Sequence, residues 1–177
     1  MGQINIDIDS YKEDEYDEEK ARWLAFKCAV QALALPAEIQ PKLLPPWVCV
    51  DELALDFDHW RRVITDLYGH MLCQNQRQAI NALDSLLEQM SGPDKAELWE
   101  GQDCLKHPKW SEVRQLAMNV LAAFGWSLEV PEVTFSMYIN SETGEIWPDS
   151  SERGSSKKEP GNSPNEENGQ INASPEP

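Results

Sequence analysis

The one regularly spaced set of metal-ligand residue types in the chain is His70-x-x-Cys73 together with Cys104-x-x-His107. Side chains three residues apart share a side of a helix or turn, and two thiolates with two imidazoles suit tetrahedral Zn²⁺. The hypothesis is a closed structural zinc site made of His70, Cys73, Cys104 and His107, with no open position for a substrate. Two simpler interpretations compete with it: cysteine is often buried as a small apolar residue, and His107 before Pro108 can cap a helix.

Familiar catalytic signatures are missing from the sequence. It contains no glycine-rich phosphate loop, no Gly-x-Ser-x-Gly and no His-Glu-x-x-His. Asp56 and His59 would share one face of a helix, where the carboxylate could orient the imidazole as a general base. No nucleophile stands near His59 in the sequence, and the acidic start of a helix explains Asp56 equally well. The sequence therefore favours a protein that is not an enzyme, while an enzyme of unfamiliar type stays an alternative.

Seven tryptophans are many for a chain of 177 residues. Three of them fall on the expected apolar faces of helices, and the other four fall at element ends or in loops. Tryptophan is enriched at binding hot spots because it buries a large area and keeps a polar edge. The four are therefore candidates for a partner-binding surface, the competing interpretation being that they seal the rim of the core. These candidates are Trp47, Trp99, Trp126 and Trp147.

The chain is strongly acidic, with a formal net charge of −16 and no basic stretch. Proteins that bind DNA or RNA directly normally carry a basic patch, because neutralising phosphates supplies most of their non-specific affinity. The charge thus argues against direct nucleic-acid binding. It suits a basic protein partner, and it also favours solubility without any partner.

Nothing in the sequence predicts a membrane segment or a secretion signal. The N-terminus has no basic region followed by an apolar run, and the apolar-leaning stretch 23–35 is interrupted by Lys27 and Gln31. The four cysteines lie far apart, so they are expected to be reduced thiols rather than a disulfide framework. We expect a cytoplasmic protein that does not enter a membrane.

Four segments repeat apolar residues at spacings of three and four, which is typical of helices with one buried face. They end at Pro36, near Met71, at Met90 and at Gly125, and a shorter helix is expected from Pro93 to Trp99. The residues expected to face the core are Trp23, Phe26, Val30 and Leu33; Leu53, Phe57, Trp60, Ile64, Leu67 and Met71; Ile80, Leu83, Leu87 and Met90; Trp110, Val113, Ala117, Val120 and Phe124.

Two segments show the alternation of polar and apolar residues that is typical of strands. Residues 3–9 place Ile4, Ile6 and Ile8 on one face, and residues 133–147 read as a hairpin around the turn 140–144. An isolated hairpin is marginally stable, so the N-terminal strand is the expected third member of a small antiparallel sheet. Such a sheet would join the two ends of the domain.

The predicted fold is mainly helical: one domain over residues 1–148, with a bundle of about four long helices and the small antiparallel sheet. Residues 149–177 hold almost no large apolar side chain and are expected to form a disordered acidic and polar tail.

The predicted function is a non-enzymatic interaction protein, such as an adaptor, an assembly factor or an immunity-type inhibitor, which acts through an acidic surface bearing tryptophans. The alternatives are a zinc-stabilised helical domain of unknown role, or an acidic mimic of nucleic acid that binds a basic protein. No cofactor is expected unless the zinc site forms.

Overall fold

The computed structural model describes residues 8–131 and 138–147 of the chain. Its long helices are α1 (Ile8–Ala34), α2 (Asp51–Tyr68), α3 (Gln74–Met90) and α4 (Pro108–Phe124). Short 3₁₀ helices lie between them: η1 (Gln40–Leu43), η2 (Gly69–Met71), η3 (Pro93–Leu98) and η4 (Gln102–Lys106). The prediction of a mainly helical protein with four long helices is therefore confirmed.

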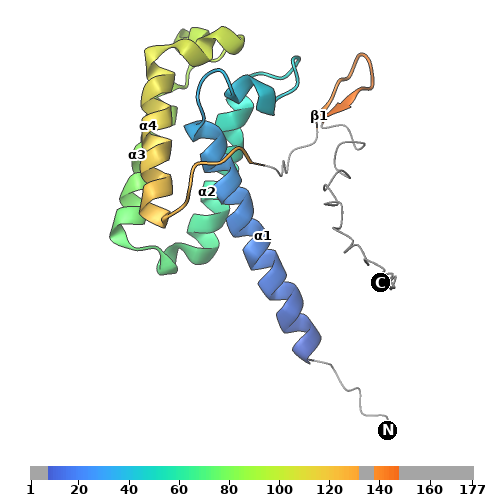
Figure 1. Ribbon diagram of the computed structural model, residues 1–177, viewed down its shortest axis with the longest axis vertical. Helices are drawn as coiled ribbons and strands as arrows, with labels where there is room; N and C mark the ends of the chain where they lie inside the picture. The colour runs from blue at the N-terminus through green and yellow to red at the C-terminus, as the bar shows by residue number, and fades with distance from the viewer. Residues whose placement is uncertain (1–7, 132–137, 148–177) are drawn as a thin grey trace, which may run out of the picture.

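The four long helices form a bundle with an uneven set of contacts (Figure 1). α1 packs closely against α2 and α4, and α4 packs closely against α3, whereas α2 and α3 meet at few residues. Successive helices run in opposite directions (Figure 1). The order around the bundle is thus α2, α1, α4, α3, and the side between α2 and α3 is its loosely packed side.

The end of α1 and both ends of α4 follow the sequence signals that predicted them. Pro36 follows the end of α1, and Pro108 is the first residue of α4, where its missing N–H leaves no hydrogen bond unmade. The imidazole Nδ1 of His107 accepts a hydrogen bond from the backbone N–H of Lys109 at 3.1 Å, which caps α4. Gly125 ends α4 in the left-handed conformation, with a φ of 68° that favours glycine.

One contiguous core holds the bundle together. Phe26 on α1, Phe57 on α2 and Trp110 on α4 are fully buried, and the rings of Phe26 and Phe57 lie 6.1 Å apart. Most of the residues predicted to face the core do so, and Trp23, Trp60 and Phe124 are partly buried against it. The buried predicted residues are Phe26, Val30, Leu33, Leu53, Phe57, Ile64, Ile80, Leu83, Leu87, Met90, Trp110, Val113, Ala117 and Val120.

The prediction for the end of the second helix is wrong. Leu67 and Met71 were expected in the core but are 50% and 59% exposed, whereas Leu72 is 4% exposed. α2 ends at Tyr68, and the chain continues through the 3₁₀ turn η2. Leu72, the residue after η2, is extended, with φ −70° and ψ 131°, so the chain leaves the helical path there. Leu72 therefore takes the inward position that the sequence pattern assigned to Met71.

The predicted sheet joining the ends of the domain is not supported. Ile8, expected in the N-terminal strand, is the first residue of α1, and residues 3–7 of that strand lie outside the described residues. In the part of the chain that the structure describes, extended pairing is limited to β1 (Tyr138–Ile139) and β2 (Ile146–Trp147), two residues each, paired antiparallel. The acid-rich segment after residue 9 lies in α1.

A buried glutamine fastens the end of α1 to the rest of the bundle. Gln40, in η1, is 0% exposed, and its side-chain N–H groups donate to the carbonyls of Ala32 and Leu33, each at 3.1 Å. Its Oε1 accepts a hydrogen bond from Arg114 Nη1 on α4 at 3.2 Å. One side chain thus satisfies two carbonyls of the last turn of α1, which have no partner within that helix.

No helix in the described ranges combines the length and the apolar character needed to cross a bilayer. The four cysteines form no disulfide; Cys28 and Cys104 are buried, and Cys49 and Cys73 are exposed. The predicted tail, residues 149–177, lies outside the described residues.

Candidate functional site

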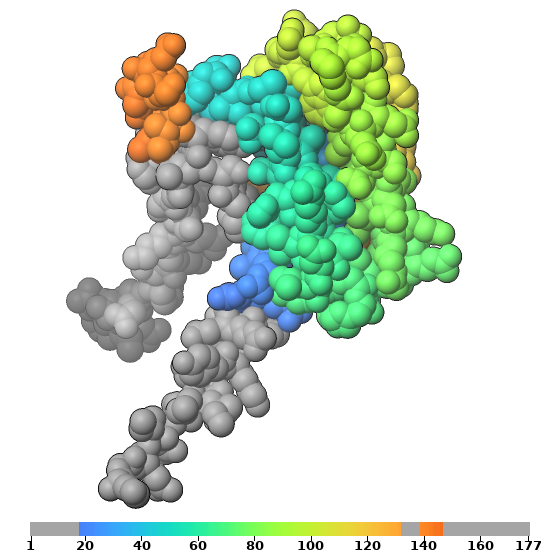
Figure 2. Space-filling model, turned by 180° about the vertical axis from the view of Figure 1, so that it is seen from behind, coloured from blue at the N-terminus to red at the C-terminus, as the bar shows by residue number. Residues whose placement is uncertain are grey.

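The loosely packed side between α2 and α3 carries two hollows, which lie along one line of the bundle. Figure 2 is viewed from this side, with α2 and α3 next to each other. The upper hollow has a volume of about 600 Å³ and lies between the beginning of α2 and the end of α3. Its lining residues are Asp51, Ala54, Leu55, Asp58, Arg61, Arg62, Asp84, Leu87, Glu88, Ser91, Gly92 and Trp99.

The lower hollow continues the same line toward the turn that joins the two helices. It has a volume of about 420 Å³ and includes residues of α2, η2 and α3. Its lining residues are Thr65, Asp66, Gly69, His70, Leu72, Arg77, Ile80 and Asn81. We call the two hollows together the α2–α3 groove.

Each helix presents one continuous stripe to this groove. Along α2 and the residue after it, lining residues recur at helical spacing, at positions 51, 54/55, 58, 61/62, 65 and 69. Along α3 and the residue after it, lining residues recur in the same way, at positions 77, 80/81, 84, 87/88 and 91. Positions three and four apart lie on one face of a helix. The groove is therefore a second face of α2 and of α3, beside the face that each turns to the core.

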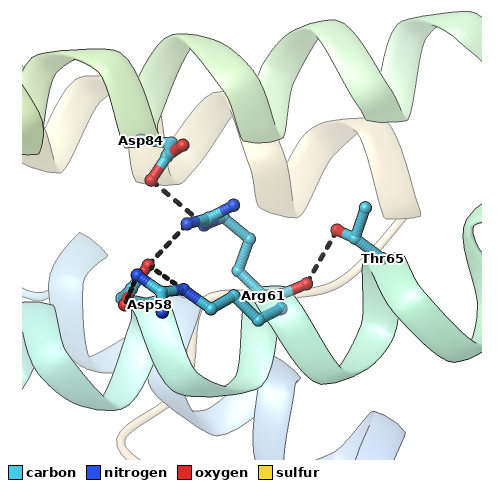
Figure 3. A network of polar contacts seen from close by, with 5 residues as sticks. Asp58, Arg61, Thr65 and Asp84 are labelled. Atoms are coloured by element: carbon cyan, nitrogen blue, oxygen red, sulfur yellow. Dashed lines mark hydrogen bonds and ion pairs between the residues drawn. The ribbon is translucent and has the colours of Figure 1, made fainter.

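A network of charged side chains crosses the groove at its middle (Figure 3). Arg61 Nη2 on α2 donates to Asp58 Oδ1 at 2.5 Å, and Arg61 Nε lies 3.0 Å from Asp84 Oδ1 on α3. Nε makes no hydrogen bond with any residue that the structure describes, so its contact with Asp84 is an attraction of charges rather than a well-directed bond. Arg62 pairs with the second carboxylate oxygen of Asp58 at 2.8 Å. The pair Arg61–Asp84 thus connects two helices that otherwise touch little.

Burial raises the pKa of the Asp84 carboxyl above its ordinary value. Arg61 lowers it in part, while Asp58 and Glu88 raise it further. The native state therefore holds the Asp84 proton to higher pH than the unfolded chain does. As pH rises through the interval between the unfolded and the native pKa, this group lowers the stability of the fold.

We expect the substitution Arg61→Gln to raise the pKa of Asp84 further, because it removes the nearest cation. The measurement is a ¹³C NMR titration of the Asp84 carboxyl. The matched control is Arg77→Gln, which removes a cation from the lower hollow and should leave this titration unchanged. A pKa of Asp84 that falls in Arg61→Gln would contradict the charge network described above.

The upper hollow carries an excess of negative charge. It is lined by four carboxylates and two arginines, and both arginines are already paired with Asp58 or Asp84. Asp51 and Glu88 form no ion pair with any residue that the structure describes. Next to them lie an exposed leucine, Leu55, and the indole of Trp99. Apolar contact area and uncompensated negative charge therefore occur together at this end of the groove.

Trp99 is fixed at the end of the upper hollow by two contacts. Its Nε1 donates to the carbonyl of Met90 at 2.8 Å, and its ring meets the ring of Trp110 edge-on, with 5.3 Å between centroids. Trp110 Nε1 in turn donates to the carbonyl of Leu98 at 2.7 Å. The two indoles tie η3 to the start of α4 and hold Trp99 in a defined position beside the groove.

The structure does not bring Trp47, Trp99 and Trp126 onto one surface feature. Of these three, whose side chains the structure describes, Trp99 alone lines the α2–α3 groove. Trp126 is partly buried, and its ring stacks on Phe124 with centroids 4.4 Å apart. Trp47 is partly buried between η1 and α2, and its Nε1 makes no hydrogen bond within the described residues. Trp147 lies in β2, opposite Tyr138. The packing of Trp126 is that of a residue sealing the core rim.

The four residues of the zinc hypothesis lie in two separate places. His70 and Cys73 lie at the turn between α2 and α3, whereas Cys104 and His107 lie before α4, beyond the other end of α3. The 17 residues of α3 span about 25 Å. No group of three or more histidine, cysteine or acidic side chains is placed to hold a metal within the ranges 8–131 and 138–147. The structure thus does not bring the two halves of the site together.

The local roles of these residues fit the simpler interpretations. His107 caps α4, as described above, and Cys73 occupies the corresponding position before α3, where its backbone N–H donates to Gln76 Oε1 at 2.9 Å. Burial raises the pKa of the Cys104 thiol to about 11, so at neutral pH it holds its proton. A metal ligand must be a thiolate, so burial disfavours the form that Cys104 would need.

No protein-family model matches the chain, and no match was found among curated proteins or among solved structures. The function is therefore inferred from the geometry of the chain itself.

The sequence patterns did not predict the groove, although the residues that line it show a helical repeat in the sequence. The small residue Ala54 and the exposed Leu55 lie among charged residues at helical spacing along α2. An ordinary solvated helix face shows the same pattern, so the pattern alone does not predict a groove. His59, considered above as a general base, is exposed and lies against the ring of Trp60 rather than in either hollow.

Proposed function

We propose that this chain is a non-enzymatic interaction protein whose partner-binding site is the α2–α3 groove. The observation that carries the proposal is the loosely packed α2–α3 side of an otherwise closed bundle, with an aligned stripe of residues on each wall. An adaptor, an assembly factor or an immunity-type inhibitor would use such a site in the same way, by holding a second protein.

The composition of the groove supports a protein partner. Binding hot spots combine apolar anchors with aromatic and arginine side chains inside a polar rim. The upper hollow offers Leu55, Leu87 and Trp99 beside charged residues of both signs. Its uncompensated acids, with a chain charge of −16, favour a partner whose contacting surface is basic.

The test is capture of partners from native lysate by the tagged full chain at low and high salt, followed by mass spectrometry. We expect a stoichiometric protein that is retained by the wild type and lost from the variant Leu55→Asp. The matched control is Leu67→Asp, since Leu67 is also an exposed leucine of α2 but lines neither hollow. Both substitutions are at exposed positions, so each should change stability by less than about 0.5 kcal/mol.

The salt dependence separates two ways of binding. If the partner stays bound at high salt, its contact with the groove is mainly apolar. If the partner is lost at high salt from both variants alike, the acidic surface as a whole mimics a nucleic acid. A partner that binds Leu55→Asp as tightly as the wild type would contradict the assignment of the site to the groove.

A further inference from the structure

We infer that the occupant of the α2–α3 groove is a basic amphipathic helix of about four to five turns, supplied by another protein and lying along α2 and α3. This inference rests on the proposed function and adds to it the kind of partner.

The length and shape of the groove favour a helix. Its lining extends from Asp51 to Gly69 along α2, which corresponds to about 27 Å at 1.5 Å per residue. Both walls are helices, and within the described residues no sheet edge borders the groove to which a strand could add. A helix satisfies its own backbone hydrogen bonds, so it can lie on such walls with apolar residues at spacings of three and four facing inward.

The wall residues set what the helix must present. Leu55 and Ala54 on α2 and Leu87 on α3 form the apolar part of the upper hollow, and Ile80 is buried at the wall of the lower one. A partner helix therefore needs an apolar stripe along its inner face. The partner helix would lie along the loosely packed side of a bundle whose order is α2, α1, α4, α3.

The two ends of the groove differ in charge, so the charges determine in which direction the partner helix lies. At the upper end, Asp51 and Glu88 have no ion-pair partner among the described residues. A lysine or arginine of the partner helix, beside its apolar stripe, would form ion pairs with these carboxylates. At the lower end, Arg77 and His70 stand with a single acid, Asp66. The partner helix is accordingly most basic where it lies against the upper hollow.

Other occupants fit the groove less well. A second copy of the chain would bring another net charge of −16 to an acidic site. The segment 149–177 of the same chain holds six acidic residues against Arg153, Lys157 and Lys158, and its one large apolar residue is Ile171. It therefore lacks the apolar stripe that the walls require.

The test uses a defined probe with the full chain: a synthetic 18-residue peptide with leucines on one helical face and lysines elsewhere. A scrambled peptide of the same composition, without the apolar face, serves as the comparison. Titration is followed by ¹⁵N NMR of the protein and by circular dichroism of the peptide. We expect shift changes along both walls of the groove, gain of peptide helicity, and clearly weaker binding of the scrambled peptide.

Matched variants test whether the helical peptide binds at the α2–α3 groove. We expect Leu55→Asp and Glu88→Lys each to weaken binding of the helical peptide about tenfold or more. Leu67→Asp and Glu112→Lys make the same chemical changes at exposed positions outside the groove and should weaken it less than about threefold.

Four results would overturn the inference. Equal binding of the helical and scrambled peptides would mean that the peptide is held only by general attraction between opposite charges. NMR shift changes away from both walls of the groove would place the binding site elsewhere. A concentration-dependent dimer in sedimentation, abolished by Leu55→Asp, would make a second copy the occupant. If a captured lysate partner is lost from Leu55→Asp while the helical peptide fails to bind, the proposed function stands and the helix inference fails.

Discussion

Replacement of Trp110 by alanine is expected to lower the free energy of unfolding by about 4 kcal/mol, the largest effect of a single side chain in this bundle. Trp110 is 0% exposed on the first turn of α4. Its removal leaves a cavity the size of an indole and deprives the carbonyl of Leu98 of its 2.7 Å hydrogen bond. The measurement is urea unfolding, with the slope against denaturant used to check that the transition stays two-state.

The control Trp110→Phe separates the cavity from the lost hydrogen bond. Phenylalanine keeps most of the buried ring but cannot donate to Leu98, so we expect a loss of about 1–2 kcal/mol. Trp126→Ala removes an indole that is only partly buried, so its cost should fall below that of Trp110→Ala. A loss under about 1.5 kcal/mol in Trp110→Ala would show that the start of α4 is not packed as described.

Replacement of Gln40 by methionine is expected to lower the free energy of unfolding by about 2–3 kcal/mol, although the side chain keeps its length and becomes more apolar. The amide makes hydrogen bonds with the carbonyls of Ala32 and Leu33 and with Arg114. Methionine would leave these buried partners without the amide, and an unsatisfied buried polar group costs about 1–3 kcal/mol. Urea unfolding of the variant at pH 7 measures the loss.

Gln115→Met is the matched control for this prediction. Gln115 is exposed on α4, where its amide reaches Asn119 at 3.3 Å, so the same substitution should change stability by less than about 0.5 kcal/mol. Equal stability of Gln40→Met and Gln115→Met would mean that the Gln40 hydrogen bonds are replaced by water. Both side chains make hydrogen bonds that involve α4: Gln40 in η1 accepts from Arg114, and Trp110 donates to Leu98 in η3.

The sequence by itself determined the helices and most of their core-facing residues. Apolar residues at spacings of three and four predicted α3 and α4 nearly to the residue, and Pro108 and Gly125 predicted both ends of α4. These features are local: a helix face needs a repeat within one segment, and a cap needs one residue type at one position. The same local logic failed at Ile8, which the alternation over residues 3–9 assigns to a strand but which begins α1; residues 3–7 lie outside the described residues.

Only the tertiary structure decided which helices touch and which do not. A stripe of mixed polar and small residues, such as the one containing Ala54, Leu55 and Asp58, has the same pattern whether it faces solvent, a neighbour or an open groove. Equally, the spacing within His70-x-x-Cys73 and within Cys104-x-x-His107 says nothing of the distance between them, and α3 separates them. Packing between segments distant in sequence determines both the groove and the separation of these pairs.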